Sequence, residues 1–542
     1  MMNKLFNRWD VLLVVGSFLL SAASGHRRDV SQNRGFTPRA LEDMRAMSLY
    51  GRDTPVADRQ YYTNATKKYY VESLPDIPKN FMTEMYSGVI PLNMSDDSRG
   101  MFFVYQPRVG PPVEEITIWF NGGPALSKGF FKRMAEFNGL GDRTHRYLML
   151  SKSRYAPGIN PYSWVNLTNM LWVEYPIGVG FSRGEPTATN EEEPAAEFIE
   201  FFRNFQTIFN ISNYKIYVTG ESYAGRYVPY VANAILDQND TTHFNLSGAL
   251  VYDPCIGSYD YSNAIAIYPW IQQNNNIMGF NSTFVDLLAQ RDQSCGYSQY
   301  REDFLQFPPN GTQPPLYLNS TADPDCDLWD LVYDSAYSVN PCFNVYEPNL
   351  QCPLLSDPLG FPSDLIYSYP GLPPYFNRTD VKKALHVPVD SDWALCTGPV
   401  FVGEGGPQDL GDLSLDPIQA VLPRVIEATN RVLVSNGALD MDLLLNGTML
   451  AIQNMTWNGQ LGFQTAPSKP IIINIPDIQY QQVFTDSGFD GFDVHQGVMG
   501  VQHFERGLMW AETYLSGHMQ PQFQPRSSYR HLQWLLGRID AL

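Results

Sequence analysis

The stretch "VTGESYAGRYVP", residues Val218–Pro229, places one serine after a β-branched run and before a segment with helical spacing. A serine at a sharp strand-to-helix turn exposes its hydroxyl, and the helix N-terminus stabilises negative charge that develops there. Such turns usually read Gly-X-Ser-X-Gly, because larger side chains would collide across them. Gly220 fits this pattern, but the second glycine, Gly225, comes one position late. Ser222 is therefore a candidate nucleophile, with an ordinary turn serine as the alternative.

A serine nucleophile needs a histidine base and an acid that orients the base, usually in the chain order serine, acid, histidine. Asp440 follows the run "RVLVSNG", where a strand-end carboxylate should lie, and Asp442 is its rival. Of the eight histidines, His518 stands out in a Gly-His turn shortly before the last helical pattern. His495 and His503 are the alternatives for the base. The chain thus contains candidates for all three roles.

The segments that must position these residues read as an α/β protein, because apolar β-rich runs alternate with helical patterns. Strands are predicted at 114–120, 167–176, 214–220, 431–437 and 471–477, with a further one at 508–515. A helix is predicted from Gly220 to Ile235, and Pro229 is expected to kink or split it. The spacing also predicts a closing helix over 529–539.

The segment 255–396 differs from the rest, since it is rich in Pro, Asn, Asp and Tyr and contains every cysteine. We interpret it as an inserted cap of poor regularity that disulfides hold together. A separate small domain is the alternative, but predicted strands continue after the segment. The six cysteines allow three disulfides in a secreted protein: Cys255, Cys295, Cys326, Cys342, Cys352 and Cys396.

The N-terminus has the layout of a secretory signal, with Lys4 and Arg8 before an apolar run, Val11–Leu20, and small residues after it. That run is too short to cross a bilayer. We therefore predict a signal peptide over residues 1–23, and a pro-segment or N-terminal extension over 24–60. The predicted location is extracellular, with delivery to a vacuole as the alternative.

Glycans are expected partners, because the chain has many Asn-X-Ser/Thr sequons. The twelve sequons begin at Asn64, Asn93, Asn166, Asn210, Asn239, Asn245, Asn281, Asn310, Asn319, Asn377, Asn446 and Asn454. A net charge of -19 and a pI near 4.8 argue against nucleic acid or an anionic membrane as the main partner. Neither a His-Glu-X-X-His pattern nor zinc-finger cysteine spacing occurs, so no metal or other cofactor is expected.

From about residue 80 to the C-terminus, the chain resembles the serine carboxypeptidases of the secreted fungal type. Its motifs match that family in the right order. They are "WFNGGP" at 119–124, "NPYSW" at 160–164, "VEYPIGVGFS" at 173–182, "GESYAGRYVP" at 220–229 and "GHMQPQFQP" at 517–525. The nucleophile motif of the family includes the displaced second glycine.

The resemblance implies an α/β-hydrolase fold, with a central, mostly parallel sheet flanked by helices and a disulfide-stapled cap insertion. The hydrolase core would comprise residues 61–254, with the nucleophile, and residues 397–542, with the acid and the histidine. The cap would be 255–396. Transferred by matching position, the resemblance makes Ser222, Asp440 and His518 the catalytic triad.

The resemblance also implies binding roles. The backbone N–H groups of Gly123 and Tyr223 would form the oxyanion hole. Asn121 and Glu221 would bind the free carboxylate of the substrate, and Glu136 is a weaker candidate because its spacing from the motif is one residue too long. A carboxyl beside a carboxylate is disfavoured in its charged form, so such a site should bind peptides best in acid.

The predicted function is that of a secreted serine-type carboxypeptidase, which cleaves the C-terminal peptide bond through an acyl-enzyme. One departure from the family is "ALSK" at 125–128, where relatives usually read Gly-Cys-Ser-Ser. Two alternatives remain: an acyltransferase or esterase that uses the same triad on the same scaffold, and a catalytically weak secreted binding protein, which this altered loop motivates. An intact set of three triad residues speaks against the last of these.

Overall fold

A computed structural model describes most of the chain. The described residues are 59–123 except 78, 80 and 81, the strand pairs 148–149 and 158–159, 162–350 except 321, 375–406 except 395 and 396, 411–473 and 497–542. They belong to one compact unit, Arg45–Leu542. The predicted signal peptide, Glu136, His495, Cys352 and Cys396 lie outside the described residues.

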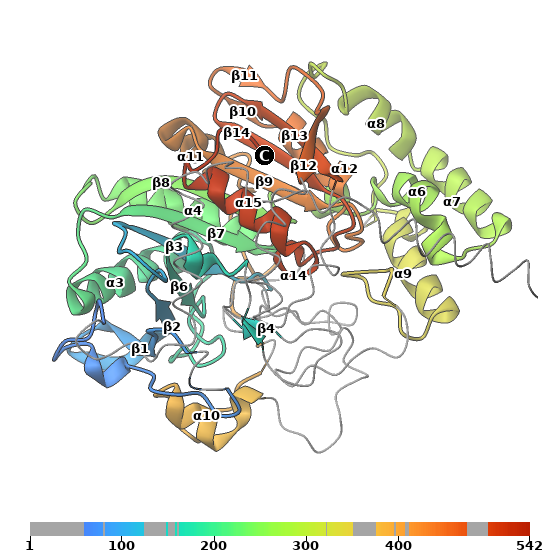
Figure 1. Ribbon diagram of the computed structural model, residues 1–542. Coiled ribbons are helices and arrows are strands. Elements are labelled where there is room, and N and C mark those ends of the chain that lie inside the picture. Colours follow the sequence, from blue (N-terminus) through green and yellow to red (C-terminus); the bar gives the residue numbers. More distant parts are fainter. Residues whose placement is uncertain are drawn as a thin grey trace, which may run out of the picture. The chain divides into compact units, whose positions relative to one another are not determined.

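A ten-stranded sheet forms the centre of this unit, in the order β1-β2-β6-β3-β7-β8-β9-β14-β13-β12 (Figure 1). Its parallel central strands are β6 (Asn169–Val173), β3 (Glu115–Phe120), β7 (Lys215–Glu221), β8 (Asn245–Tyr252), β9 (Val432–Gly437) and β14 (Leu508–Thr513). Antiparallel strands extend both edges: β1 (Tyr86–Asn93) with β2 (Asp96–Gln106), and β12 (Lys469–Ile473) with β13 (Gly497–Glu505). The predicted α/β class and mostly parallel sheet are confirmed.

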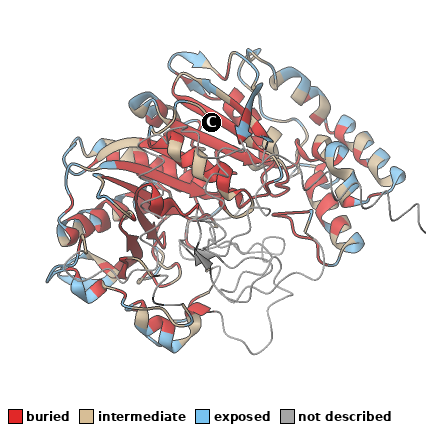
Figure 2. Ribbon diagram, in the orientation of Figure 1, coloured by how far each residue is buried: buried red, intermediate tan, exposed pale blue. Residues whose placement is uncertain are grey.

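The central strands are apolar because helices cover both faces of a parallel sheet. Every residue of β3, β6 and β9 is buried, and Figure 2 shows the central strands of the sheet as a buried layer. These three strands, β7 and β14 were predicted from their apolar runs. The prediction at 471–477 agrees with β12 as far as residue 473, where the description of that segment ends.

Helices α3 (Glu192–Phe209), α4 (Ala224–Asp237) and α11 (Leu422–Thr429) pack together on one face of the sheet, in a core that includes five phenylalanines of α3. Helix α15 (Pro525–Leu535) packs on β8 and β9, in a second core with Trp119 and Trp172 (Figure 1). Pro229 does not split α4, so that alternative was wrong. All residues from Ala224 to Ala232 are buried, and this packing offsets the missing backbone N–H.

The predicted cap contains regular helices, so its expected irregularity was wrong. They are α5 (Tyr259–Ser262), α6 (Ile267–Met278), α7 (Ser282–Ser294), α8 (Tyr297–Phe304), α9 (Leu328–Val339) and α10 (Thr379–Ala384). The Asn and Asp residues that suggested loops cap these helices: Asn281 accepts from the backbone N–H of Phe284, and Asp327 from that of Asp330. Helices α6 to α9 enclose a core of their own, which also contains Met441 and Met519.

The remaining elements are short. They are α12 (Leu445–Gln453), α14 (Gln520–Phe523), strands β4 (Leu148–Met149), β5 (Gly158–Ile159), β10 (Thr456–Trp457) and β11 (Gln460–Leu461), and the 3-10 turns Lys67–Tyr69, Trp164–Asn166, Pro324–Cys326 and Tyr375–Asn377. Within the described part of the chain, the helices lack the combined length and apolar character that a membrane span requires.

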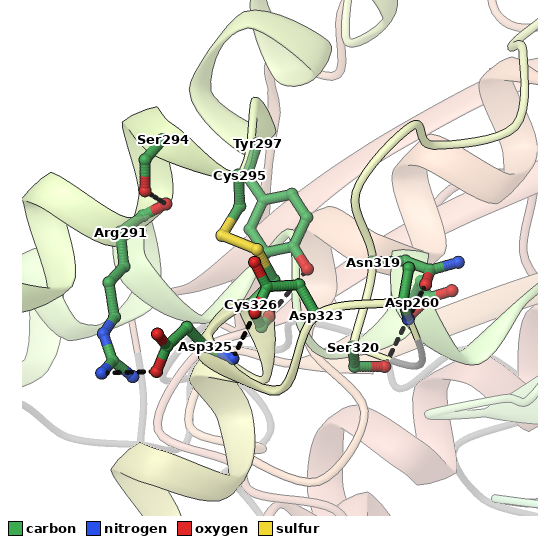
Figure 3. Close-up of a disulfide and its surroundings, with 11 residues drawn as sticks. Asp260, Arg291, Ser294, Cys295, Tyr297, Asn319, Ser320, Asp323, Asp325 and Cys326 are labelled. Atoms are coloured by element: carbon green, nitrogen blue, oxygen red, sulfur yellow. Dashed lines mark hydrogen bonds and ion pairs between the residues drawn. A yellow bond between two sulfur atoms is a disulfide. The ribbon is translucent and has the colours of Figure 1, made fainter.

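A disulfide between Cys295 and Cys326 joins the end of α7 to the turn before α9 (Figure 3). Beside it, the Tyr297 hydroxyl donates to the carbonyl of Cys326 at 2.7 Å, and Arg291 pairs with Asp325 at 2.9 Å. Cys342 is disulfide-bonded as well. The expectation that disulfides hold this segment together is therefore confirmed for Cys295–Cys326.

Replacing both cysteines, Cys295→Ala with Cys326→Ala, should lower the free energy of unfolding by about 3–4 kcal/mol, since the bridge closes a loop with a sequence separation of 31 residues. Urea unfolding of the oxidised protein measures this loss. Ser294→Ala, one position before the bridge, is the control and should change stability little. An unchanged urea midpoint in the double variant would contradict the prediction.

Candidate active site

Ser222 occupies a strained turn between β7 and α4. Its φ is +65°, in the left-handed region that side chains other than glycine rarely adopt. Its backbone N–H donates to the carbonyl of Tyr252 at 2.9 Å, and its carbonyl accepts from Gly225 and Cys255 at 2.8 and 3.0 Å. The turn is thus tied to the end of the neighbouring strand β8. Strain of this kind persists only where surrounding contacts hold it, and it is common at active sites.

The geometry explains why the second glycine of the motif is displaced. A Cβ on Gly225 would lie 2.6 Å from the backbone nitrogen of Cys255, and one on Gly220 would lie 2.7 Å from the carbonyl oxygen of Phe120. Ala224, between the serine and this contact, is buried without such a requirement. The position where the α4 backbone comes too close to the backbone of Cys255 for a side chain is therefore residue 225.

Asp440 and His518 meet in the fully buried interior. Oδ2 of Asp440 lies 2.7 Å from Nδ1 of His518. Oδ1 of Asp440 accepts from the backbone N–H groups of Asp442 and Leu443, at 2.7 and 3.2 Å. Asp440 is therefore the carboxylate bonded to Nδ1 of the histidine. His503 lies on β13 and pairs with Glu505 at 3.0 Å.

The sheet brings the three predicted triad positions to one edge. Ser222 follows β7, Asp440 follows β9 and His518 follows β14, and β7, β8, β9 and β14 are successive parallel neighbours. The carboxyl ends of parallel strands lie at the same edge of a sheet, where α/β proteins form their binding sites. This arrangement suits a serine hydrolase.

The predicted binding residues lie at the same edge. Strand β3 pairs with β7 up to Phe120 and Gly220, so Asn121 and Gly123 begin the loop beside the serine turn. Oδ1 of Asn121 accepts from the Trp119 indole at 2.5 Å. Glu221 is the buried last residue of β7, and Tyr223 is the N-cap residue directly before α4. Glu136 lies outside the described residues.

The cap holds the histidine turn, which the sequence did not predict. The backbone N–H of His518 donates to the carbonyl of Tyr346 at 2.8 Å, and that of Gly517 donates to Oε2 of Glu347 at 2.5 Å. A Cβ on Gly517 would lie 1.8 Å from the Tyr346 carbonyl oxygen. Position 517 therefore requires glycine, and the Gly-His turn was the only sequence signal for this contact.

A further carboxyl group, that of Asp253, was also missed by the sequence analysis. It is fully buried at the end of β8, and donor atoms of Asp253, Asp440 and His518 all lie within 4.8 Å of one another. Burial, reinforced by the charge of Asp440, raises the pKa of Asp253 well above its usual value. Among the described residues, these three are also the group whose donors could hold a metal ion.

Comparison with known proteins is consistent with this geometry. The chain matches the serine carboxypeptidase family over residues 75–538. The chain belongs to this family. It is 55% identical over 493 residues to serine-type carboxypeptidase F of Aspergillus niger, with 90% of each chain covered. It is 39% identical over 506 residues to a probable serine carboxypeptidase of Arthroderma benhamiae, again with 90% of each covered.

A solved structure supports the fold. The crystal structure of a prohormone-processing carboxypeptidase from Saccharomyces cerevisiae matches with a TM-score of 0.62 and 21% sequence identity, covering 88% of this chain and 97% of that one. The predicted α/β-hydrolase fold and the resemblance to serine carboxypeptidases are both confirmed. The protein is a serine-type carboxypeptidase.

The two neighbouring aspartates should differ sharply in their effect on catalysis. Asp440→Asn should lower kcat by about 10⁴-fold, because the amide cannot hold the histidine in the tautomer that a base requires. Asp442→Asn is the matched control and should stay within a few-fold of wild type. Steady-state kinetics on an N-blocked peptide measures both variants. A similar loss in the two variants would contradict the assignment.

Proposed function

We propose that the protein is a secreted, glycosylated exopeptidase that removes residues one at a time from peptide C-termini and works best at acidic pH. The main support is the 2.7 Å contact between Asp440 and His518, at the sheet edge where the strained Ser222 turn also lies. Family membership supplies the reaction class. The roles of single residues are inferred from their positions.

In this proposal Ser222 attacks the last peptide carbonyl, and His518 takes the proton from its hydroxyl and passes it to the leaving amine. Asp440 accepts from Nδ1 of His518, which leaves Nε2 available as the base, and it stabilises the imidazolium that forms. The backbone N–H groups of Gly123 and Tyr223 donate to the developing oxyanion, a contribution of about 3–4 kcal/mol per donor. Water then releases the acyl group.

Asn121 and Glu221 are proposed to bind the free carboxylate of the substrate. Both are buried at the ends of adjacent strands, β3 and β7, and Glu221 directly precedes Ser222. A protonated Glu221 can donate a hydrogen bond to the substrate carboxylate, whereas an ionised one repels it. Binding through Glu221 therefore favours acid. Glu136 is kept as the weaker third candidate.

Acidic working conditions are also supported by buried carboxyl groups. Asp412 accepts from the Tyr223 hydroxyl at 2.6 Å and lies 3.7 Å from the Arg226 guanidinium. Glu191 is fully buried, and among the described residues its carboxyl oxygens have no hydrogen-bond partner. Burial, with the nearby charge of Asp412, raises the pKa of Glu191 well above its usual value. Burial likewise raises the pKa of Glu174 to about 8.

Secretion and glycosylation rest on the sequence and on exposure. Of the sequon asparagines, Asn166 is buried at 3% exposure, so we propose that it carries no glycan. Others are exposed and accessible to N-glycosylation: Asn64, Asn93, Asn210, Asn239, Asn281 and Asn310. Carboxyl groups that favour their protonated forms suit an acidic extracellular medium and also an acidic vacuole. Peptide or protein C-termini remain the proposed substrates.

A peptide with an amidated C-terminus should be a poor substrate. Losing the charged hydrogen bond to the substrate carboxylate should lower kcat/KM by about 100-fold, which corresponds to about 3 kcal/mol. Release of the last residue, measured by mass spectrometry over time, compares the amide with the free acid. An N-acetylated free acid is the control and should be cleaved normally, and Ser222→Ala should cleave none. Equal cleavage of the amidated peptide and the free-acid peptide would contradict the proposal.

Glu191 should make the protein less stable as the pH rises. Its folded pKa lies above the unfolded value of 4.5, so above that pH the unfolded chain loses a proton that the folded one keeps. Stability then falls by up to about 1.4 kcal/mol per pH unit until the folded pKa is reached. Glu191→Gln lacks this proton equilibrium, so its free energy of unfolding should rise relative to that of wild type as the pH increases over the same range.

Urea unfolding at pH 4, 5, 6 and 7 measures the difference between the variant and wild type. The adjacent Glu192→Gln is the control, since Glu192 is exposed and should show no growing difference. A constant difference between Glu191→Gln and wild type across this range would show that Glu191 ionises normally in the folded protein.

A further inference from the structure

Asp253 connects the two loops that carry the acid and the base. Its Oδ1 accepts from the backbone N–H of Gly437 at 2.7 Å, at the start of the loop to Asp440. Its Oδ2 accepts from Nε2 of Gln520 at 2.6 Å, and the backbone N–H of Gln520 donates to the carbonyl of His518 at 3.0 Å. One buried side chain thus contacts a near neighbour of each residue in the catalytic pair.

The same side chain is linked to the nucleophile turn. Asp253 follows Tyr252, whose carbonyl accepts from the backbone N–H of Ser222 at 2.9 Å. Its own φ of +41° is unusual for a residue with a side chain, so the backbone there is held by its contacts. Its backbone N–H donates to the carbonyl of Ser435 on β9 at 2.7 Å. Asp253 therefore lies between all three proposed catalytic loops.

The charges around Asp253 determine whether its buried carboxyl is more stable protonated or ionised. Among the described residues, the titratable groups that face it are Asp440, from the loop after β9, and His518, from the loop after β14. The other side chains that contact it, Asn436 and Gln520, are uncharged. Two ionised carboxylates beside one neutral imidazole would leave two negative charges buried without a cation, which is strongly unfavourable.

We propose that Asp253 is a positioning residue of the catalytic triad, which ties the Asp440 loop to the His518 loop as an uncharged carboxylic acid. Its proton has an acceptor when the Gln520 carboxamide is turned by about 180°, so that Oε1 takes the place of Nε2 beside Oδ2 of Asp253. Nε2 of Gln520 then donates to the Ser435 hydroxyl, which lies 2.7 Å from the carboxamide and 3.3 Å from the hydroxyl of Thr513. The side chains of Asp253, Gln520, Ser435 and Thr513 thus stay linked by hydrogen bonds in that arrangement.

An uncharged Asp253 would also serve catalysis in acid. A second negative charge beside His518 would raise the pKa of the imidazole and keep it protonated, and a protonated histidine cannot accept the serine proton. With Asp440 as the only charge, His518 remains a base at lower pH. This inference rests on the proposed triad and extends it to a fourth side chain that touches neither substrate nor reacting atoms.

The test is the rate at which a fluorophosphonate probe labels Ser222, measured from acidic to neutral pH. Asp253→Asn preserves the size and hydrogen bonds of an uncharged carboxyl. Its labelling rate should therefore stay within about threefold of wild type, and the rate should fall to half at the same acidic pH (the midpoint of the acid limb). Asp253→Leu loses both loop contacts and should label at least about tenfold more slowly. Rescue by asparagine but not by leucine is the expected pattern.

Three results would overturn the proposal. An acid limb that moves down by about one pH unit in Asp253→Asn would show that wild-type Asp253 is charged. Equal losses in the asparagine and leucine variants would show that an ionised carboxylate is required. Wild-type labelling in Asp253→Leu would show that the residue does not position the triad. If the leucine variant fails to fold, Gln520→Leu removes the hydrogen bond that links Asp253 to the His518 loop, and Ser222 in this variant should also be labelled about tenfold more slowly.

Asp292→Asn is the matched control for loss of a buried aspartate. Asp292 pairs with Arg301 at 2.6 Å in the cap, so this change should lower stability without altering the pH profile of labelling. The labelling rate depends on serine activation and not on a peptide terminus. Equal cleavage of amidated and free peptides would therefore overturn the proposed exopeptidase function and leave the role of Asp253 intact.

Discussion

The hydrogen bond between Asp440 and His518 sets the main constraint on this fold, because it places a carboxyl group in a fully buried site. Such a group is tolerated only when its oxygens are satisfied, and here the histidine and two backbone N–H groups do so. These donors come from loops after β9 and β14, which must end at the same edge as β7. The parallel order β7-β8-β9-β14 meets this requirement.

Much of this arrangement could be predicted from the sequence, because it depends on local patterns. Apolar runs revealed most central strands, and the Gly-Glu-Ser turn revealed Ser222. The choice between Asp440 and Asp442 could not be made from the residues alone, since both follow the same strand by a few positions. It depends on which carboxylate the loop turns toward His518. The cap helices were missed because their capping residues, such as Asn281 and Asp327, read equally well as loop residues.

The residues that support the site were the hardest to predict, because their partners are distant in the chain. Glu347 contacts Gly517 across 170 positions, and Asp253 contacts Gly437 across 184. No spacing rule links such pairs before the sheet and the cap are assembled. The strained φ of Ser222 is similar, since the contact that holds it comes from Tyr252 on the next strand. Local patterns therefore locate the chemistry, whereas tertiary contacts hold its geometry.

Two buried carboxyl pairs flank the nucleophile turn, and both follow the same electrostatic rule. In each pair one member is well supplied with donors: Asp440 by His518, and Asp412 by Tyr223 and Arg226. Burial and the neighbouring charge then raise the pKa of the other member, Asp253 or Glu191. A second buried charge in either pair is unfavourable, so protonation of one member stabilises the fold around Ser222. In our proposal, an uncharged Asp253 also lets His518 act as a base at a lower pH than a charged one would. The proposed preference for acidic pH thus has one physical reason, the cost of a second buried charge.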